Sequence, residues 1–386
     1  MASRIDRVSE PADSGAYSQL ESVRSAVRKI SAPRIFRVLF LGLIATVVTT
    51  SSSAAQRSDG KGRPPASASA MPVVFEKKAT KNSEALNSSG TQPKKTVSKD
   101  PQVQEFESRP STSITDDDVK KLADHPPALE QIQTLNLKGA QVSGASLSLL
   151  SRFTSLEHLD LSGVAIDAKE LSAISTAVQL KHLSLAGCSL RDEAFAAIAP
   201  LTELRVLNLS STKITDAGFV HLHKLTKLEE IYVSGNPITG NGFQALGPKG
   251  AKAPLRIVHA GSSDFGLFGL FHLKNVNSIE ELVAAGCKMS DQSLQGIRSM
   301  KKLRRLHIAG NDISDSGLKV LTGMKAMEDL DISNTINVSN ETLKRLKTFR
   351  QLKTLNIEST SCNEAGVMAL KKSLTGCTIR FNKREY

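Results

Sequence analysis

Residues 204–227 read LRVLNLSSTKITDAGFVHLHKLTK, and this stretch contains two different patterns of apolar residues. It opens with Leu204, Leu207 and Leu209, and the last two must point to the same side of an extended chain because side chains alternate along a strand. After Ile214, apolar residues recur at helical spacing, and the Thr-Asp pair that follows offers a hydroxyl and a carboxylate suited to a helix start. The stretch therefore predicts a strand, a turn and a short helix.

The same spacing of leucines returns along most of the chain. Blocks of the form apolar-x-x-apolar-x-apolar follow one another at intervals of 24 residues, with single intervals of 27, 25 and 22. A period held this closely identifies a protein built from stacked repeats. The blocks begin at Ile132, Leu156, Leu180, Leu204, Leu228, Leu255, Ile279, Leu303, Met327, Leu352 and, in degenerate form, at Leu374.

The repeats also share a longer motif, Leu-x-x-Leu-x-Leu-x-x-Thr-x-Ile-Thr-Asp-x-Gly. Residues 204–218 carry it almost whole, as do residues 303–317 with Asn311 at the ninth position, which Cys188 and Cys287 occupy in their own repeats. The sequence resembles the leucine-rich-repeat proteins, in particular the helix-bearing, cysteine-containing and ribonuclease-inhibitor-like repeats. This resemblance implies an α/β fold, a curved solenoid with a parallel sheet on its concave face and helices on its convex face, and a role in binding proteins.

Most of the positive charge lies outside the repeats. The formal net charge is +12; residues 1–100 hold 16 Lys and Arg against 8 Asp and Glu, or +8, which leaves 34 against 30, or +4, for residues 101–386. The repeat region shows no basic stripe interleaved with aromatic residues, the pattern expected along a nucleic-acid backbone. We therefore expect no nucleic-acid partner.

The four cysteines are too few and too scattered for a disulfide scaffold. Cys188 and Cys287 lie four repeats apart, so they cannot bridge each other, and we expect them to be buried where their strands end. Cys362 and Cys377 fall near the end of the array. A disulfide between these two is an open alternative.

Residues 1–55 are interpreted as an N-terminal leader. An uncharged apolar run covers residues 38–48 after several basic residues, and small residues reach Ala55. This order is typical of a secretory signal peptide, although the long stretch before the run also suits an uncleaved signal-anchor. Both interpretations predict export, to a secreted, periplasmic or extracellular location. Residues 56–112, rich in Ser, Pro and Lys, are predicted to be a disordered linker.

Two places interrupt the rhythm of the repeats. Three extra residues fall within 247–254, which is predicted to be a loop. The helical segment 265–271 is the most apolar of all, and it is either fully buried or partly exposed for a partner. The predicted leucine-rich-repeat domain is 113–386, divided into an N-terminal half-repeat cap at 113–131, ten repeats at 132–373 and a C-terminal cap strand within 374–386.

The residues that flank the inward leucines of each strand are predicted to face the concave side. In the fourth to eighth repeats they form an apolar and aromatic centre with charged residues around it, as protein interfaces commonly do. We expect Tyr232, the only tyrosine in the repeats, to be an exposed anchor for a protein partner. The candidate protein-binding residues are Val206, Glu230, Tyr232, Ile257, His259, Glu281, Val283, Arg305 and His307.

Other candidate sites are weaker. His158, Asp160 and His182 share one face on adjacent strands, but three candidates fall short of a zinc site with its supporting residues, so surface polar residues are the preferred interpretation. The sequence contains no phosphate loop, dinucleotide fingerprint or nucleophile elbow. No catalytic residue, cofactor or metal is predicted.

These patterns together predict an exported, non-enzymatic scaffold that recognises a protein through its concave face. Membrane contact is expected only through the N-terminal segment, if it is not cleaved. The alternative is an intracellular substrate-recognition adaptor that resembles the repeat arm of F-box ubiquitin ligases. That alternative requires residues 34–55 not to enter a membrane.

Overall fold

The structure is a computed structural model that describes residues 99–386, apart from 248, 249, 251 and 275. The chain divides into two units, residues 1–74 and 75–386, and all described residues belong to the second. The predicted leader, its apolar run and the first part of the linker lie outside the described residues. None of the helices in the described part of the chain has both the length and the apolar character that a membrane span requires.

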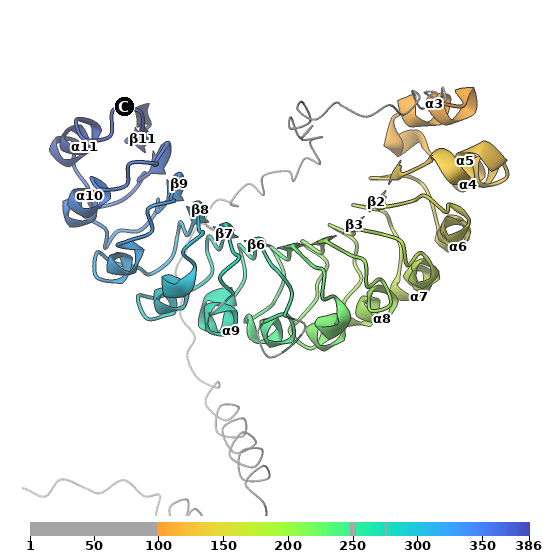
Figure 1. Cartoon of the computed structure of the whole chain (residues 1–386), viewed down its shortest axis with the longest axis horizontal. Coiled ribbons are helices and arrows are strands. Elements are labelled where there is room, and N and C mark those ends of the chain that lie inside the picture. Colours follow the sequence, from red (N-terminus) through yellow and green to blue (C-terminus); the bar gives the residue numbers. More distant parts are fainter. Residues whose placement is uncertain (1–98, 248–249, 251, 275) are drawn as a thin grey trace, which may run out of the picture. The chain divides into compact units, whose positions relative to one another are not determined.

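Each repeat contributes one short strand to a single sheet, and the strands stand side by side in the order of the sequence. Strands β1 to β11 pair in parallel, so that Leu207 lies opposite Leu183 on one side and Ile231 on the other. Figure 1 shows the strands along the inner side of an arc and the helices along its outer side, which confirms the predicted α/β solenoid. The strands are β1 Thr134–Asn136, β2 His158–Asp160, β3 His182–Ser184, β4 Val206–Asn208, β5 Glu230–Tyr232, β6 Ile257–His259, β7 Glu281–Val283, β8 Arg305–His307, β9 Asp329–Asp331, β10 Thr354–Asn356, β11 Thr378–Phe381 and β12 Arg384–Glu385.

The outer side carries both α-helices and 3₁₀ helices. A 3₁₀ helix rises about 2.0 Å per residue against about 1.5 Å in an α-helix. A 3₁₀ segment therefore covers the same distance along the outer side with fewer residues than an α-helix. The α-helices are α3 Pro101–Ser108, α4 Asp116–Ala123, α5 Pro126–Gln131, α6 Gly144–Leu149, α7 Ala168–Leu171, α8 Phe195–Ile198, α9 Gly269–Leu273, α10 Asn340–Leu346 and α11 Glu364–Lys371. The 3₁₀ helices are η1 Ser111–Ser113, η2 Leu150–Arg152, η3 Ser172–Thr176, η4 Asp192–Ala194, η5 Gly218–Lys224, η6 Asn241–Ala245, η7 Phe265–Leu267, η8 Ser293–Ser299 and η9 Gly317–Leu321.

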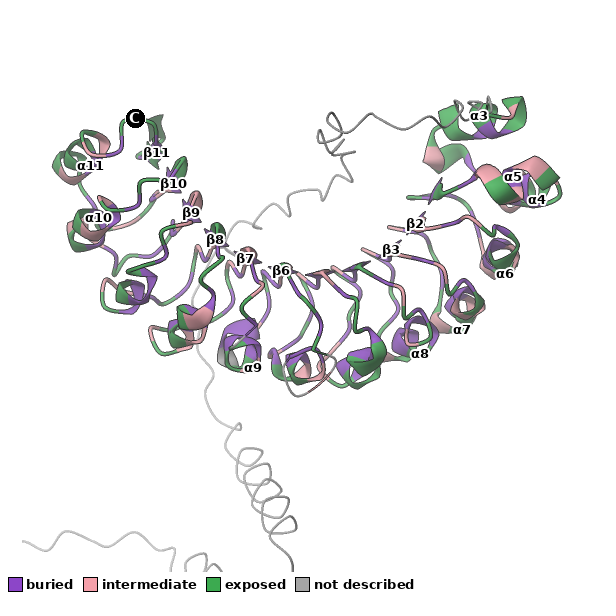
Figure 2. Ribbon diagram, in the orientation of Figure 1, coloured by how far each residue is buried: buried purple, intermediate pink, exposed green. Residues whose placement is uncertain are grey.

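The core runs along the arc between the strands and the helices, where Figure 2 shows the buried residues. The leucines of each block fill the strand side of it, and a row of phenylalanines fills part of the helix side. The ring centroids of Phe195, Phe219 and Phe243 follow one another at 5.8 and 5.2 Å. A Cβ at Gly218 would lie 2.2 Å from the Phe195 ring, and one at Gly242 would lie 2.6 Å from the Phe219 ring. The glycine of the motif therefore makes room for the ring of the preceding repeat.

Where a repeat carries the aspartate of the Ile-Thr-Asp motif, this side chain links it to the next repeat. The carboxylate of Asp216 accepts hydrogen bonds from the backbone N–H and the hydroxyl of Thr239, at 2.7 and 2.8 Å, and from the N–H of Gly242 at 2.8 Å. These N–H groups belong to the start of the following helical segment, where no intrahelical acceptor is available. The same link recurs from Asp192 to Thr215, from Asp291 to Ser314 and from Asp315 to Ser339.

The N-terminal cap is longer than predicted. Residues 101–108, expected to belong to the linker, form α3, whose Val103 and Phe106 are buried. The side chain of Asp100 accepts from a backbone N–H in the first turn of α3 and also contacts His125 at 2.8 Å. Pro126 begins α5, because proline is tolerated in the first turn of a helix. The cap therefore consists of three α-helices and the 3₁₀ helix η1 rather than one half-repeat.

The last block of the array begins two residues later than predicted. Strand β11 pairs with β10 so that Leu355 lies opposite Ile379, an interval of 24 residues and not 22. Ile379 and Phe381 are buried and close the stack. The chain then turns at Asn382 and Lys383, both with positive φ, and returns as β12, which pairs antiparallel with β11.

The apolar segment 265–271 is buried only in part. Phe265 takes the isoleucine position of the motif, is fully buried and meets the Phe243 ring edge-on at 5.1 Å. Its ring packs against Gly269. A Cβ at this position would lie only 2.1 Å from the ring, so the absence of a side chain makes room for it. Phe268 and Phe271, in contrast, are 46% and 58% exposed on the outer side. Full burial of this segment, one of the two alternatives, is therefore wrong.

Candidate functional site

The candidate protein-binding residues lie side by side on the concave face, on strands β4 to β8. The pairing of the strands arranges them in two rows that cross the sheet. Because successive side chains of a strand alternate between faces, the first and third residues of each strand share this face. The first row contains Val206, Glu230, Ile257, Glu281 and Arg305, and the second contains Tyr232, His259, Val283 and His307.

Tyr232 is not the exposed anchor that we expected. It is only 8% exposed, and Val206 beside it is only 7% exposed. The hydroxyl of Tyr232 donates to the Glu230 carboxylate at 2.8 Å, and its ring meets that of His259 edge-on, with centroids 4.7 Å apart. Burial raises the pKa of Tyr232 well above its usual value, with the neighbouring Glu230 charge as a further cause. Since adjacent strands are only about 5 Å apart, a ring that lies along the sheet is covered by its neighbours.

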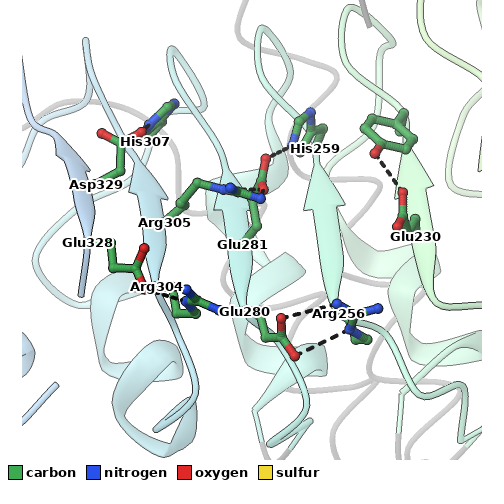
Figure 3. Close-up of polar contacts among 11 residues, drawn as sticks. Glu230, Arg256, His259, Glu280, Glu281, Arg304, Arg305, His307, Glu328 and Asp329 are labelled. Atoms are coloured by element: carbon green, nitrogen blue, oxygen red, sulfur yellow. Dashed lines mark hydrogen bonds and ion pairs between the residues drawn. The ribbon is translucent and has the colours of Figure 1, made fainter. Parts of the chain in front are cut away.

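A chain of polar contacts continues from His259 to Arg305 across β6, β7 and β8 (Figure 3). The His259 imidazole contacts the Glu281 carboxylate at 2.7 Å, and Arg305 forms an ion pair with the other oxygen of the same carboxylate. Burial alone would raise the pKa of Glu281, but the hydrogen bonds with His259 and Arg305 outweigh it and lower the pKa. Glu281 is therefore an anion held between two partners, and the side chain of Arg305 remains 46% exposed.

A second pair lies one strand further along. His307 contacts Asp329 at 3.0 Å, and the other oxygen of Asp329 accepts a hydrogen bond from Thr354 at 2.5 Å. The hydrogen bond with Asp329 raises the pKa of His307, against the opposing effect of burial. Burial would raise the pKa of Asp329, but its hydrogen bonds with His307 and Thr354 lower it. The concave face of β5 to β10 thus carries two groups of charged and polar side chains in contact with one another.

A row of charges at the edge of the sheet, here called the edge ladder, was not among the predicted site residues. Its members are the residues immediately before each strand, whereas the predicted residues all lie within the strands. In Figure 3, Arg256 pairs with Glu280 at 3.2 Å and Arg304 pairs with Glu328. The row could have been found in the sequence, because from Arg205 onward the residues immediately before the strands alternate between positive and negative charge. The ladder consists of Glu157, Lys181, Arg205, Glu229, Arg256, Glu280, Arg304, Glu328 and Lys353.

His158 and His182 meet on the same face near the N-terminal end, with ring centroids 4.0 Å apart. Burial, and then the neighbouring His158, lower the pKa of His182 to about 4. Asp160 accepts hydrogen bonds from the N–H and the hydroxyl of Ser162. Among the described residues, no group of three or more His, Cys, Asp or Glu side chains is placed to hold a metal ion.

The cysteines are buried thiols. Cys188 and Cys287 donate to the backbone carbonyls of Leu161 and Ala260 at 3.1 and 3.0 Å, in the predicted position at the end of their strands. Cys362 and Cys377 are both free, so the alternative of a disulfide between them is wrong. Burial raises the pKa of Cys377 to about 11, which keeps the thiol protonated at neutral pH.

Two family models match the sequence of the chain. The model "Leucine Rich repeats (2 copies)" matches residues 202–241, and the model "Leucine Rich repeat" matches residues 299–321. A comparison of the sequence with curated proteins found no match.

Solved structures of several repeat proteins are similar to this chain. An internalin from Listeria monocytogenes is 15% identical, with 69% of this chain and 94% of the internalin covered and a TM-score of 0.43. A leucine-rich-repeat protein of Leptospira interrogans is 16% identical, with 67% and 74% covered and a TM-score of 0.45. A TDR receptor is 15% identical, with 72% and 47% covered and a TM-score of 0.46.

The family matches fall in two separate parts of one continuous array. Between them and on both sides, each repeat adds one parallel strand in sequence order and buries the leucines of its block. The ninth position of the motif is buried in both matched parts, where Asn236 and Asn311 bond to backbone groups of the preceding repeat. Residues 202–241 and 299–321 are thus leucine-rich repeats by sequence, and the array that contains them has the fold of a leucine-rich-repeat solenoid.

Proposed function

We propose that this protein is an exported, non-enzymatic scaffold that binds a protein partner on the concave face of its sheet. The observation that carries the proposal is the contact chain from Tyr232 through His259 and Glu281 to Arg305. It holds an exposed guanidinium in a defined position on a rigid sheet. Arginine is a frequent energetic centre of protein interfaces because its planar fork pairs with carboxylates in two hydrogen bonds.

The arrangement of the face supports binding of a folded surface or an extended acidic segment. Side chains that are already fixed lose little conformational entropy when a partner covers them. Beyond Arg305, the face continues into His307 and Asp329, so both signs of charge are offered within two strands. Such alternation favours one orientation of a partner over others. Tyr232 contributes by positioning His259 rather than by direct contact.

We expect Arg305→Gln to weaken binding of the partner at least tenfold, because an arginine at the centre of an interface contributes on the order of 2 kcal/mol. The partner is captured from the exported proteome with the full chain, purified, and its Kd measured by calorimetry. The matched control is Arg152→Gln. Arg152 is also an arginine in an ion pair and is similarly exposed, at 44% against 46%, but it lies near the N-terminal cap. Equal Kd values for the two variants would exclude this face as the binding site.

Export is tested separately. Residues 1–60 fused to an enzyme that is active only outside the cytoplasm should give activity in the native host, because the apolar run 38–48 follows a basic flank. A fusion in which three leucines of that run are replaced by glutamate is the control and should be inactive. Equal activity of both fusions, or activity of neither, would contradict export by this segment.

A further inference from the structure

One flank of the solenoid is strongly basic in its C-terminal half. The register of the strands shows which residues of different repeats are equivalent. One set of equivalent segments consists of the eight residues of each repeat that come immediately before the next leucine block and lead from the helical side back to the strand. In repeats six to ten these segments contain 12 Lys or Arg and no Asp or Glu. We call them the basic flank. It comprises residues 271–278, 295–302, 319–326, 344–351 and 368–375.

Compensation of helix dipoles does not explain this excess. Basic residues are favourable near helix C-termini, and the same argument applies to every repeat. The equivalent segments of repeats one to five hold only 5 Lys or Arg and one Glu. These segments are 148–155, 172–179, 196–203, 220–227 and 247–254. The charge of the whole repeat region is therefore nearly balanced, but its positive charges gather on one surface. This surface is recognised only when the repeats are aligned by the register of the strands.

Seven of the 12 basic side chains of the basic flank have no internal partner among the described residues. Of the other five, Lys344 forms an ion pair, three donate to backbone carbonyls and one lies over an aromatic ring. The basic residues of the concave face and the edge ladder form ion pairs, for example Arg256, Arg304 and Arg305. Within the described residues, in contrast, no ion pair involves these flank residues: Arg298, Lys301, Lys302, Lys319, Lys325, Lys347 and Lys372. Unpaired cations of one sign along a surface raise its potential and attract anions.

The chemistry of the flank favours a lipid surface over a nucleic acid. Nine of its 12 basic residues are lysines, which act as point charges without the bidentate geometry of arginine. Phe271 is 58% exposed, with the ammonium of Lys274 4.1 Å from its ring centre, and Met368 is 47% exposed at the equivalent position of repeat ten. Exposed apolar side chains among cations are typical of proteins that lie on anionic membranes. Phe349, the other aromatic residue of the flank, is only 4% exposed, so it offers no stacking platform for bases.

We propose that the basic flank binds the surface of an anionic membrane, with the lysines against lipid headgroups and Phe271 in the interface. This contact is separate from the concave face, so a membrane and a protein partner would occupy different sides of the same repeats. It is also separate from any anchoring by the N-terminal segment. The inference does not depend on the proposed function, because the two surfaces share none of the residues that are tested.

The test measures partitioning of the full chain onto vesicles by flotation. One set of vesicles is phosphatidylcholine alone, and the other contains phosphatidylserine as well. The flank variant replaces Lys301, Lys302 and Lys325 by glutamine. The matched control replaces Lys120, Lys121 and Lys169 by glutamine, which changes the net charge equally at exposed lysines of the cap and second repeat. Both variants retain residues 1–98, so any background from that segment is the same.

The flank variant should partition onto the phosphatidylserine vesicles at least tenfold less than the wild type, because each lysine near an anionic surface contributes roughly a fivefold factor. The control variant should lose less than threefold, and the difference should shrink at high salt. Phe271→Ser should weaken vesicle binding without changing binding to a short DNA duplex. Equal losses for the two triple variants would overturn the proposal. So would a flank variant that loses duplex binding but keeps vesicle binding, since the surface would then serve a nucleic acid.

Discussion

Replacing Phe219 by alanine is expected to lower the free energy of unfolding by about 3–5 kcal/mol. The side chain is fully buried between Phe195 and Phe243, and the backbone of Gly242 lies against its ring. The neighbouring repeats are held in register by the sheet, so they cannot close the cavity. The loss therefore includes both the transfer of the ring to water and the cavity that remains.

Urea titration followed by circular dichroism measures this effect. The control is Phe271→Ala, which removes an exposed ring and should change the stability by no more than about 0.5 kcal/mol. A loss below about 1 kcal/mol for Phe219→Ala would show that the row of phenylalanines does not support the cooperative core.

The stability of the protein should fall as the pH decreases from 6.5 towards 4, and His182→Gln should remove part of this fall. Burial, with His158 as the next cause, lowers the pKa of His182 from 6.5 to about 4. Between these values the unfolded chain binds a proton that the folded chain does not, so stability is lost as the pH decreases. Each pKa unit corresponds to about 1.4 kcal/mol, and partial solvent screening reduces the expected difference to about 1–2 kcal/mol.

Urea titrations at pH 7 and pH 4.5 provide the measurement. His182→Gln should lose less stability between the two pH values than the wild type does. His221→Gln is the control, because His221 is exposed on η5. If the His182 variant and the wild type lose the same stability, the imidazole does not resist protonation in the folded state.

Much of the fold could be predicted because its repeats are short and nearly identical. The leucine positions fixed one strand per repeat, and the motif fixed where each outer segment begins. Errors arose where local patterns were ambiguous. The block at Leu374 satisfied the apolar pattern two residues too early, and only the pairing of Leu355 with Ile379 decides the register. Helix α3 was assigned to the linker because Val103 and Phe106 alone carry its buried face.

The candidate site was harder to predict because it depends on contacts between repeats. Periodicity gives the face on which a side chain lies, but not whether adjacent side chains cover it. Tyr232 was expected to be exposed for this reason, although Glu230 and His259 enclose it. The edge ladder and the basic flank were both readable as charges in the sequence. They became recognisable as rows only after the strands had been aligned by their hydrogen bonds.

The antiparallel return of β12 covers the edge of the sheet at its C-terminal end. A wide parallel sheet ends in strands whose free backbone groups could recruit a strand from another molecule. Beside β11 that position is taken by β12, which is only two residues long and carries Arg384 and Glu385. Short, charged edges of this kind resist further strand addition. Copies of the protein should therefore meet through their side-chain surfaces, and self-assembly into fibres by growth of the sheet should be blocked at this end.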